Sequence, residues 1–591
     1  MSKLSILGGP KIITKKMKLH NSIGKEERNI VNKVMKSGKL SAFYGTWGDG
    51  FYGGKYVQKF EKDCSNFFKV KYALSVNSWT SGLIASVGAL DINPGDEIIV
   101  SPWSMCASAT AIIHWNAIPI FADIEYDTYN LDPVDVIRKI TKRTKAIMSV
   151  DIFGHSAPIN ELKKIARKYN LKIISDSAQS PGAKYNNKFA GTATDIGGIS
   201  LNYHKHINTG EGGVIFTNNK KYAERIAMIR NHAEAIVVKK KVKNLANLVG
   251  YNFRMGEIEA AIGIEQLKKL KKIIKKKQDT AKLLINGLKG LSGLKLPIIK
   301  KNCSHVFYVF PLQVDGKKLG VHRNRIYEAL QAEGVEGLQI NFTHIPRLPL
   351  FKKKIAYGSK GFPWTINKHA KKIKYTDGIC PVADDLQDNK YLGIALCSYV
   401  FDKQDVKNLI KAFHKVWNKL ESLKWKSFFL ENKRFIVRNF NHKDINKEYL
   451  SWFNGKNENL KFSRHYKKRY NRRVLADNLK NFSNSEDIFL GIFDIKTEEL
   501  IGTITVYIDN KKKSGNLGIF IGNKKFFSKG YALESCQIVI KFLFKEKFVN
   551  SIVAGTKNEN IKMINLMKNL NMKKMIKKDT LNTSYTINKL L

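Results

Sequence analysis

The chain has 591 residues, of which 43% are hydrophobic and 11% aromatic, so it can bury more than one core and is not a disordered chain. Lys and Arg number 102 against 50 Asp and Glu, which gives a formal net charge of +52. Because the lysines are spread over every segment without a nucleic-acid-binding motif, the charge does not indicate a nucleic-acid partner, although a basic surface favours an anionic small substrate.

The first part of the chain alternates apolar strand-like runs with amphipathic helical runs. We predict strands at 72–76, 96–100, 118–123, 146–153 and 171–175, and helices at 80–90, 104–115, 132–140 and 159–169. This alternation predicts an α/β domain with a largely parallel sheet, in which function lies at the carboxyl ends of the strands. A long lysine-rich helix at 257–277 and a smaller mixed segment from 306 to 416 follow.

Residues 417–433 are polar and aromatic without a clear period, and we predict that they link two domains. Beyond them, strands are predicted at 435–438, 488–493, 500–508, 517–521 and 551–555, and helices at 530–545 and 561–570. This pattern predicts a separate α+β domain over residues 434–591.

One segment of the first part, Ser200–Gly213, places a single lysine, Lys205, between a hydroxyl at Ser200 and a glycine cluster that begins at Gly210. Upstream, an apolar run ends in the carboxylate of Asp176. Pyridoxal phosphate (PLP) chemistry needs an amine that forms a Schiff base and a carboxylate that keeps the pyridine nitrogen protonated. It also needs hydroxyls and backbone N–H groups for the phosphate. The sequence therefore predicts a PLP enzyme.

Residues 1–416 resemble the DegT/DnrJ/EryC1/StrS family of PLP-dependent sugar aminotransferases. The matching blocks, in chain order, are Asn77–Leu83, Pro94–Ile99, Pro119–Asp123, Arg143–Ile147, Asp176–Ala183, Ser200–Gly213 and Gly250–Ala261. The resemblance implies the aspartate-aminotransferase fold, fold type I, with a large α/β domain over about 1–290 and a small domain over about 291–416.

The resemblance also assigns roles by position. Lys205 would bind PLP covalently and move the proton during transamination, Asp176 would pair with the pyridine nitrogen, and Gln179 would lie near the phenolic oxygen. The phosphate would be held by Ser200, Thr80 and the backbone of Trp79 and Ser81. Asn252 would reach the phosphate from a partner subunit, which implies a homodimer with shared active sites.

Three points leave alternatives open. Trp79 stands where the family has glycine, so its side chain either crowds the loop or shapes the cofactor pocket. Trp103 and Met105 both compete for the position that stacks on the cofactor ring. Some relatives carry histidine in place of the lysine and are sugar dehydratases. His204 flanks Lys205 here, but Lys205 lies at the family's lysine spacing, which favours transamination.

Residues from 434 onward resemble the GNAT acetyltransferase superfamily, in its RimJ/RimL-like branch. The matching blocks are Gly518–Gly522, Phe527–Ser535 and Asn558–Met572. The resemblance implies acetyl-CoA binding by Lys529, Gly530 and Ala532 at a pyrophosphate loop, and by Asn560. Phe527 replaces the usual Arg or Gln, and Met567 stands where many relatives have the tyrosine acid. Glu534 and Asp509 are candidates for the base.

Together the two modules predict a bifunctional enzyme of amino-sugar biosynthesis for a surface polysaccharide. The first would transfer an amino group, with glutamate as donor, to a nucleotide-linked keto-deoxy sugar, and the second would acetylate the new amine. Candidate substrate-side residues are Arg254, His305 and His344. One alternative keeps the aminotransferase and lets the second module acetylate a protein N-terminus or another amine. Another class of alternative is a PLP-binding regulatory protein without turnover.

The cysteines and the apolar segments bear on location. The six cysteines lack CxxC spacing, which argues against metal sites and a disulfide framework and fits a reducing cytoplasm. The N-terminus has no long apolar run, so no secretory signal is expected. Residues 98–122 carry no charged side chain, but Pro102 and Pro119 interrupt them, so we expect a buried passage and no membrane span.

Overall fold

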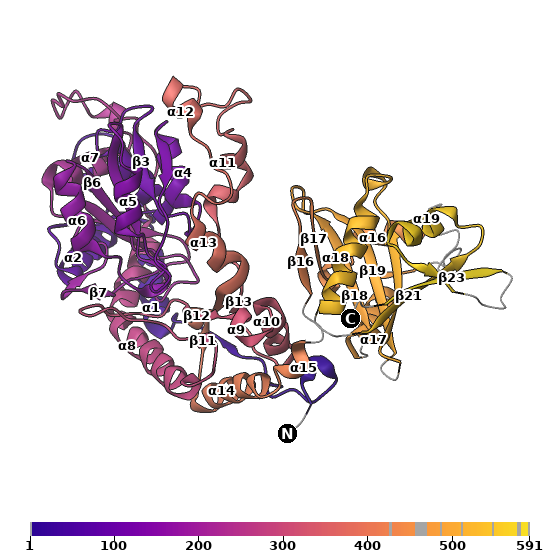
Figure 1. The fold of residues 1–591 in the computed structure, drawn as a ribbon. Helices are drawn as coiled ribbons and strands as arrows, with labels where there is room; N and C mark the ends of the chain where they lie inside the picture. Colours follow the sequence, from indigo (N-terminus) through magenta and orange to yellow (C-terminus); the bar gives the residue numbers. More distant parts are fainter. Residues whose placement is uncertain are drawn as a thin grey trace. The chain divides into compact units, whose positions relative to one another are not determined.

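The computed structural model describes residues 3–424, 428–454, 470–484, 487–509, 512–545, 549–575 and 581–588 (Figure 1). The chain divides into two compact units. The first comprises Ile13–Asp315 and Val335–Lys411, and the second comprises Met1–Ile12, Gly316–Gly334 and Ala412–Leu591. The domain limits at 290, 416 and 434 stay predictions, and residues 425–427 of the predicted linker lie outside the described ranges.

The first unit is built on a 7-stranded sheet with the order β2-β10-β9-β6-β5-β3-β4. Only β10 runs antiparallel to its neighbours, so the predicted largely parallel sheet is confirmed. Its strands are β2 (Tyr72–Val76), β3 (Glu97–Val100), β4 (Ile118–Phe121), β5 (Thr144–Val150), β6 (Lys172–Asp176), β9 (Ile196–Ser200) and β10 (Gly213–Thr217).

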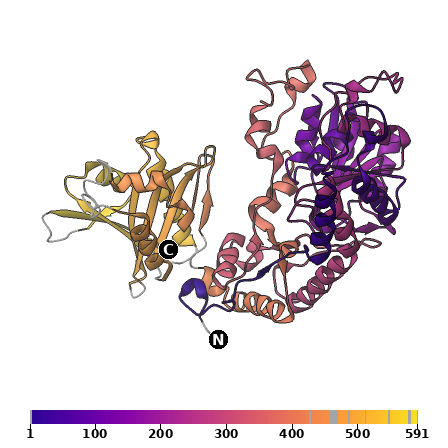
Figure 2. The same cartoon turned by 180° about the vertical axis from the view of Figure 1, so that it is seen from behind.

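Helices cover both faces of this sheet, which is why its strands are buried along most of their length. On β3, Ile98 and Val100 pack with α3, α4 and α7, whereas Ile99 packs with α5 and α6. Figure 2 shows the same layers from behind. The helices are α1 (Lys25–Ser37), α2 (Lys55–Phe68), α3 (Trp79–Gly88), α4 (Ala107–His114), α5 (Pro133–Lys139), α6 (Ile159–Lys168), α7 (Lys220–Arg230) and α8 (Glu257–Leu288).

A 4-stranded antiparallel sheet, β11-β12-β14-β13, and two short pairs, β1-β15 and β7-β8, complete the strands described in the first unit. The bounds are β1 (Lys18–Leu19), β7 (Lys184–Tyr185), β8 (Lys188–Phe189), β11 (Leu294–Lys295), β12 (Phe310–Val314), β13 (Leu338–Gln339), β14 (Tyr391–Ile394), β15 (Tyr399–Val400), α11 (Pro349–Lys353), α12 (Lys368–Lys372) and α13 (Pro381–Asp385). Helix α14 (Lys403–Trp417) runs across the unit limit.

The second unit holds an 8-stranded sheet, β16-β17-β18-β19-β20-β21-β23-β22, in which β20 and β21 are parallel and the other neighbours antiparallel. Its strands are β16 (Phe429–Glu431), β17 (Phe435–Asn439), β18 (Ile488–Asp494), β19 (Leu500–Asp509), β20 (Ser514–Ile521), β21 (Ser551–Lys557), β22 (Lys573–Lys574) and β23 (Asn582–Asn588). Its helices are α9 (Gly316–Leu319), α10 (Arg323–Ala332), α15 (Glu421–Lys424), α16 (Lys447–Asn454), α17 (Arg472–Asn484), α18 (Tyr531–Lys545) and α19 (Ile561–Asn569). The predicted α+β character is confirmed.

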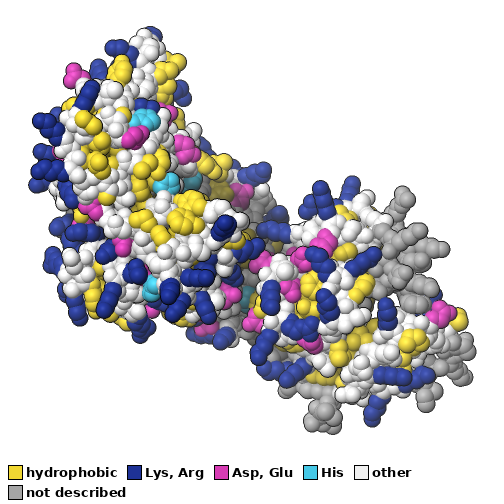
Figure 3. Space-filling model, turned by 90° about the horizontal axis from the view of Figure 1, so that it is seen from above, with side chains coloured by type: hydrophobic (Ala, Val, Ile, Leu, Met, Phe, Trp, Pro, Cys, Tyr) yellow, Lys and Arg dark blue, Asp and Glu magenta, His cyan; other side chains and the backbone are white. Residues whose placement is uncertain are grey.

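Lysine and arginine side chains are dispersed over the face drawn in Figure 3, with apolar and acidic side chains between them. This dispersal agrees with the interpretation of the charge as a general property of the chain. Within the described ranges, no helix combines the length and the apolar character needed to cross a bilayer.

Candidate functional site

Lys205 lies in the loop that follows β9, at the carboxyl end of the parallel strands. Its side chain is 8% exposed, and its ammonium nitrogen has no hydrogen-bond acceptor among the described residues. The nitrogen lies over the ring of Tyr308, 4.5 Å from the centroid. Burial lowers the pKa of Lys205 from 10.5 to about 8, and the negative charge of Asp176 partly opposes that shift. A buried amine with a lowered pKa is suited to nucleophilic chemistry.

Asp176 is the last residue of β6 and is 4% exposed. Its carboxylate accepts a hydrogen bond at each oxygen: from the Trp79 indole to Oδ1 at 2.7 Å and from the Ser108 hydroxyl to Oδ2 at 2.7 Å. The backbone N–H of Ala178 also donates to Oδ1, at 3.2 Å. Asp176 pairs with Gly198 on β9, the strand that leads to Lys205, so the two groups lie at the same edge of the sheet.

The predicted phosphate-binding residues surround the N-terminus of α3. Ser78 caps this helix and accepts a hydrogen bond from the backbone N–H of Ser81 at 3.1 Å. Trp79 and Thr80 are the first helical residues, where backbone N–H groups lack intrahelical acceptors and the helix dipole favours an anion. Thr80 is exposed, and its hydroxyl makes no hydrogen bond within the described chain. Such a helix start can receive a phosphate.

Ser200 and Gln179 lie at two neighbouring strand ends. Ser200 closes β9, and its hydroxyl accepts a hydrogen bond from the backbone N–H of Asn202 at 3.3 Å. The Gln179 side-chain oxygen accepts the backbone N–H of Phe153 at 2.8 Å. Both side chains are buried. The two therefore lie at the same edge of the sheet as Asp176 and Lys205.

Asn252 is exposed beside the α3 loop of its own chain. Its backbone oxygen accepts a hydrogen bond from the side chain of Asn77 at 3.2 Å, and its Oδ1 accepts one from Arg254 at 2.7 Å. Its predicted contact with the phosphate of a partner subunit stays a prediction.

The structure shows where the competing aromatic side chains and the candidate histidines lie. Trp103 is fully buried and donates its indole N–H to Gln387 at 3.0 Å, whereas Met105 is 61% exposed. His204 is partly buried, and burial lowers its pKa to about 4. His305 is buried and stacks on Phe307 at 4.1 Å, which leaves it poorly placed for a substrate.

The donor set fits PLP. The structure brings together a buried unpaired amine, a carboxylate held by three donors, and a helix start with an exposed hydroxyl. Each group has the chemistry that the aldehyde, the ring nitrogen or the phosphate of PLP requires. Lys205, Asp176 and the start of α3 would hold the cofactor.

In the second unit, Gly530 directly precedes α18 with a left-handed backbone conformation, φ +84°. Arg434 covers this turn: it donates to the backbone oxygen of Lys529 at 2.7 Å and pairs with Glu534. Ala532 is the second residue of α18, where a small side chain leaves the backbone N–H groups accessible. Glu534 is thus engaged with Arg434, which does not favour it as a base.

The parallel strands β20 and β21 diverge. They pair only from Ser514 with Ser551 to Asn516 with Val553, although both strands continue further. Asn560 follows β21 and caps α19, accepting the backbone N–H of Met563 at 3.2 Å. Met567 is fully buried in the core of this unit and offers no acid.

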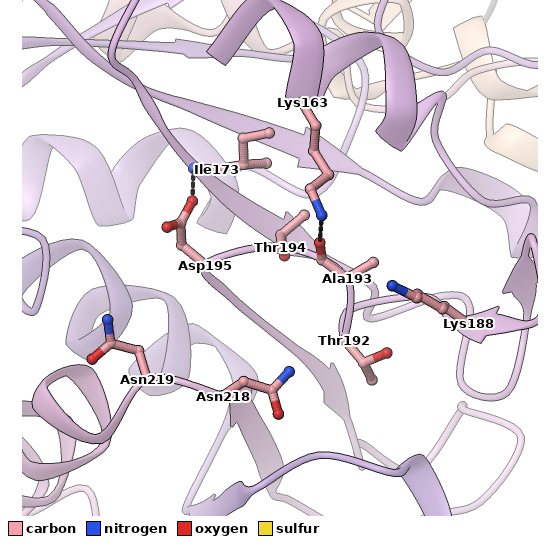
Figure 4. Close-up of a pocket in the computed structure, with 9 residues that line it drawn as sticks. All are labelled: Lys163, Ile173, Lys188, Thr192, Ala193, Thr194, Asp195, Asn218 and Asn219. Carbon is pink, nitrogen blue, oxygen red and sulfur yellow. Dashed lines mark hydrogen bonds between the residues drawn. The ribbon is translucent and has the colours of Figure 1, made fainter. Parts of the chain in front are cut away.

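A cavity of about 440 Å³ lies elsewhere in the first unit (Figure 4). It is lined by Ile173 and Asp195 near the starts of β6 and β9, and by Lys163, which donates to the backbone oxygen of Ala193 at 3.0 Å. Because these are the amino ends of parallel strands, the cavity lies at the opposite edge of the sheet from Asp176. It is not part of the predicted cofactor site.

Sequence reasoning missed two side chains, of which Tyr308 contacts Lys205. Tyr308 precedes β12, and no local pattern connects it to the lysine block. Lys277 is a second buried lysine, whose pKa burial lowers to about 8, but its ammonium is held by the backbone oxygens of Leu396 and Tyr399.

Comparisons with known proteins agree with this geometry. Residues 21–385 match the DegT/DnrJ/EryC1/StrS aminotransferase family, and residues 434–573 match an acetyltransferase (GNAT) domain. The spore coat polysaccharide biosynthesis protein SpsC of Bacillus subtilis is 31% identical over 357 residues, 59% of this chain and 89% of that protein. GDP-perosamine synthase of Vibrio cholerae is 32% identical over 317 residues, 53% of this chain and 82% of that protein.

Among solved structures, Helicobacter pylori PseC is an aminotransferase involved in the biosynthesis of pseudoaminic acid. It aligns with a TM-score of 0.55 and 25% identity over 68% of this chain and 100% of its own. The expected aminotransferase fold and the acetyltransferase domain are thereby confirmed.

Proposed function

The chain belongs to the DegT/DnrJ/EryC1/StrS aminotransferase family and also carries a GNAT acetyltransferase domain, and from this premise we propose that it makes an acetamido-deoxy sugar in two steps. The first step moves an amino group from an amino acid, glutamate, to a nucleotide-linked keto-deoxy sugar. The second step acetylates that amine with acetyl-CoA. The observation that carries the proposal is the placement of Lys205 and Asp176 at one edge of the sheet, in a chain that also holds an acetyltransferase domain.

PLP supplies the electron sink through which an amino group is exchanged for a carbonyl oxygen. Lys205 then takes and returns the proton at the reacting carbon, a role that its burial and its pKa of about 8 support. Asp176 holds a positive charge at the ring nitrogen, and the start of α3 binds the phosphate. The burial of Lys205 and Asp176 keeps bulk water away from both groups.

The sugar nucleotide is supported by the relatives and by charge. Among the similar proteins, one is a GDP-perosamine synthase and another a dTDP-3-amino-3,6-dideoxy-alpha-D-galactopyranose transaminase. Both of those names denote nucleotide-linked amino sugars, and a basic protein favours an anionic substrate. We place the reaction in the cytoplasm, in line with six free cysteines.

Joining the two steps in one chain would raise the effective concentration of the amino sugar at the second site. The divergence of β20 from β21 and the left-handed turn at Gly530 support acetyl-CoA as the cosubstrate. The residues proposed to bind it are Lys529, Gly530, Ala532 and Asn560.

A second candidate function is acetylation of a protein N-terminus or another amine by the same domain. Membership of an aminotransferase family argues against the alternative that the chain is a PLP-binding regulatory protein without turnover.

We further propose a homodimer with shared sites. Tyr44, Trp47 and Tyr52 expose aromatic surface, and Asn231 donates to the backbone oxygen of Tyr44 at 2.8 Å. Asn231 also forms a backbone bridge with Asn252. An aromatic surface beside Asn252 supports a second copy docking there.

The test is incubation of the full chain with keto-deoxy sugar nucleotides, glutamate and acetyl-CoA, followed by mass measurement. The proposal expects the mass of an amino sugar without acetyl-CoA and of an acetamido sugar with it. Amination without acetylation, together with acetylation of added peptides, would select the second candidate. Failure to aminate any keto sugar would overturn the proposed first step.

A further inference from the structure

Trp79 fills a space that three glycines provide. Its indole is 5% exposed. A Cβ added at Gly198 would lie 2.1 Å from the indole ring, and one added at Gly82 would lie 2.7 Å from it. A Cβ at Gly213 would lie 2.8 Å from the Trp79 backbone nitrogen. Since Gly198 on β9 is the strand partner of Asp176, the indole lies on the sheet beside that carboxylate.

Trp79 is also a hydrogen-bond donor to the carboxylate. Its indole N–H reaches Oδ1 of Asp176 at 2.7 Å, and the backbone N–H of Ala178 reaches the same oxygen at 3.2 Å. Oδ2 receives one donor, the Ser108 hydroxyl, at 2.7 Å. A carboxylate oxygen has about two acceptor positions. Oδ1 is therefore filled, and Oδ2 keeps one position free.

We propose that Trp79 is a positioning residue, whose indole N–H orients Asp176 so that Oδ2 accepts a hydrogen bond from the protonated PLP ring nitrogen. The inference rests on the PLP chemistry of the proposed function and deepens it. It answers the question that the sequence left open: the side chain at position 79 does not crowd the phosphate loop but turns back to the sheet. Its effect on the cofactor passes through Asp176.

The chain offers a matched control. Trp115 is 6% exposed in the same unit, and its indole N–H donates to the backbone oxygen of Ile84 at 2.7 Å. Trp79→Phe and Trp115→Phe therefore each remove one buried indole donor with the same donor–acceptor distance, and only the first removes a donor from Asp176. A general loss of packing would affect both variants alike.

The test measures the PLP dissociation constant and the long-wavelength absorbance of bound PLP. This absorbance depends on protonation of the nitrogen that joins PLP to Lys205, which in turn responds to the charge of the ring nitrogen. Losing a hydrogen bond to a charged group should weaken PLP binding by about tenfold in Trp79→Phe. The long-wavelength band should weaken with it, while Trp115→Phe keeps both properties. Unchanged PLP binding and absorbance in a folded Trp79→Phe protein, or equal losses in both variants, would overturn the inference.

A second measurement needs no folded Trp79→Phe protein. In the wild-type chain labelled with ¹⁵N-tryptophan, the indole signal of Trp79 should shift when PLP is added, and that of Trp115 should not. An unmoved Trp79 signal contradicts the inference. Failure of the proposed function can be distinguished from failure of this inference. If wild-type protein aminates no keto sugar while Trp79→Phe still releases PLP more readily than Trp115→Phe, the role of Trp79 stands.

Discussion

The ammonium nitrogen of Lys205 lies over the ring of Tyr308, 4.5 Å from the ring centroid. A cation over an aromatic face is stabilised by the ring quadrupole. Tyr308 therefore opposes the burial that lowers the pKa of Lys205 to about 8. With a pKa of about 8, the amine of Lys205 is half protonated and half neutral near pH 8.

Replacing Tyr308 by leucine should lower the pKa of Lys205 by about half a unit, because a cation–π contact of about 0.5–1 kcal/mol is lost. Tyr308→Phe keeps the ring and should leave the pKa unchanged. The pKa can be read from the pH dependence of covalent PLP uptake by the apoprotein. Equal midpoints in the leucine and phenylalanine variants would show that the ring does not act on the amine.

The pH dependence of PLP uptake follows from the same pKa. Below about pH 8 the amine of Lys205 is protonated and unreactive, so uptake should rise through pH 8 and level off above it. Asp176 raises the pKa of Lys205, so Asp176→Asn should move the midpoint below 8. A rate of PLP uptake that keeps rising up to about pH 10.5, the ordinary pKa of lysine, would contradict a lowered pKa for Lys205.

Asn560 has a structural role that can be separated from binding of acetyl-CoA. Its side-chain oxygen caps α19, and its amide nitrogen donates to Thr556 at 3.0 Å. Asn560→Ala should destabilise the second unit by about 1 kcal/mol, the usual cost of a lost cap. Asn560→Asp keeps the cap but loses the amide donor. If Asn560 binds acetyl-CoA through that amide, both variants raise the KM for acetyl-CoA; a normal KM in Asn560→Asp limits the residue to capping.

Gly530 should be intolerant of a side chain. Its φ of +84° strains any L residue, and an added Cβ would lie 3.4 Å from Glu534. Gly530→Ala should cost about 1 kcal/mol or more and raise the KM for acetyl-CoA severalfold, because the backbone N–H groups of the turn shift. Gly290 has φ +90° with open space around it, so Gly290→Ala carries the backbone strain alone. A KM for acetyl-CoA that changes equally in both variants would remove Gly530 from the binding site.

The parts that the sequence predicted are those encoded locally. Asp176 ends an apolar run and Lys205 follows another, and strand ends of a parallel sheet meet at one edge. The predicted helices at 80–90 and 530–545 lie within two residues of α3 and α18. The contact of Trp79 with Asp176 was not predictable, because Trp79, Gly82 and Gly198 fit one another only after helix and sheet have packed.

The same limit explains why the sequence does not identify Lys277 as a buried lysine like Lys205. Lys277 and Lys205 are each buried, each with a pKa near 8, and nothing in the local pattern of Lys277 distinguishes it from its exposed neighbours on α8. What separates the two is the partner of the ammonium: backbone oxygens hold Lys277, whereas Lys205 meets an aromatic ring near a carboxylate. Only the folded chain supplies these partners.

The most direct test of the central claim is to trap PLP on the full chain with borohydride and to locate the adduct by peptide mass spectrometry. The account predicts one stoichiometric adduct, on Lys205, and its absence from Lys205→Ala, with Lys277 unmodified. An adduct on Lys277 or on a surface lysine, with Lys205 free, would contradict the account.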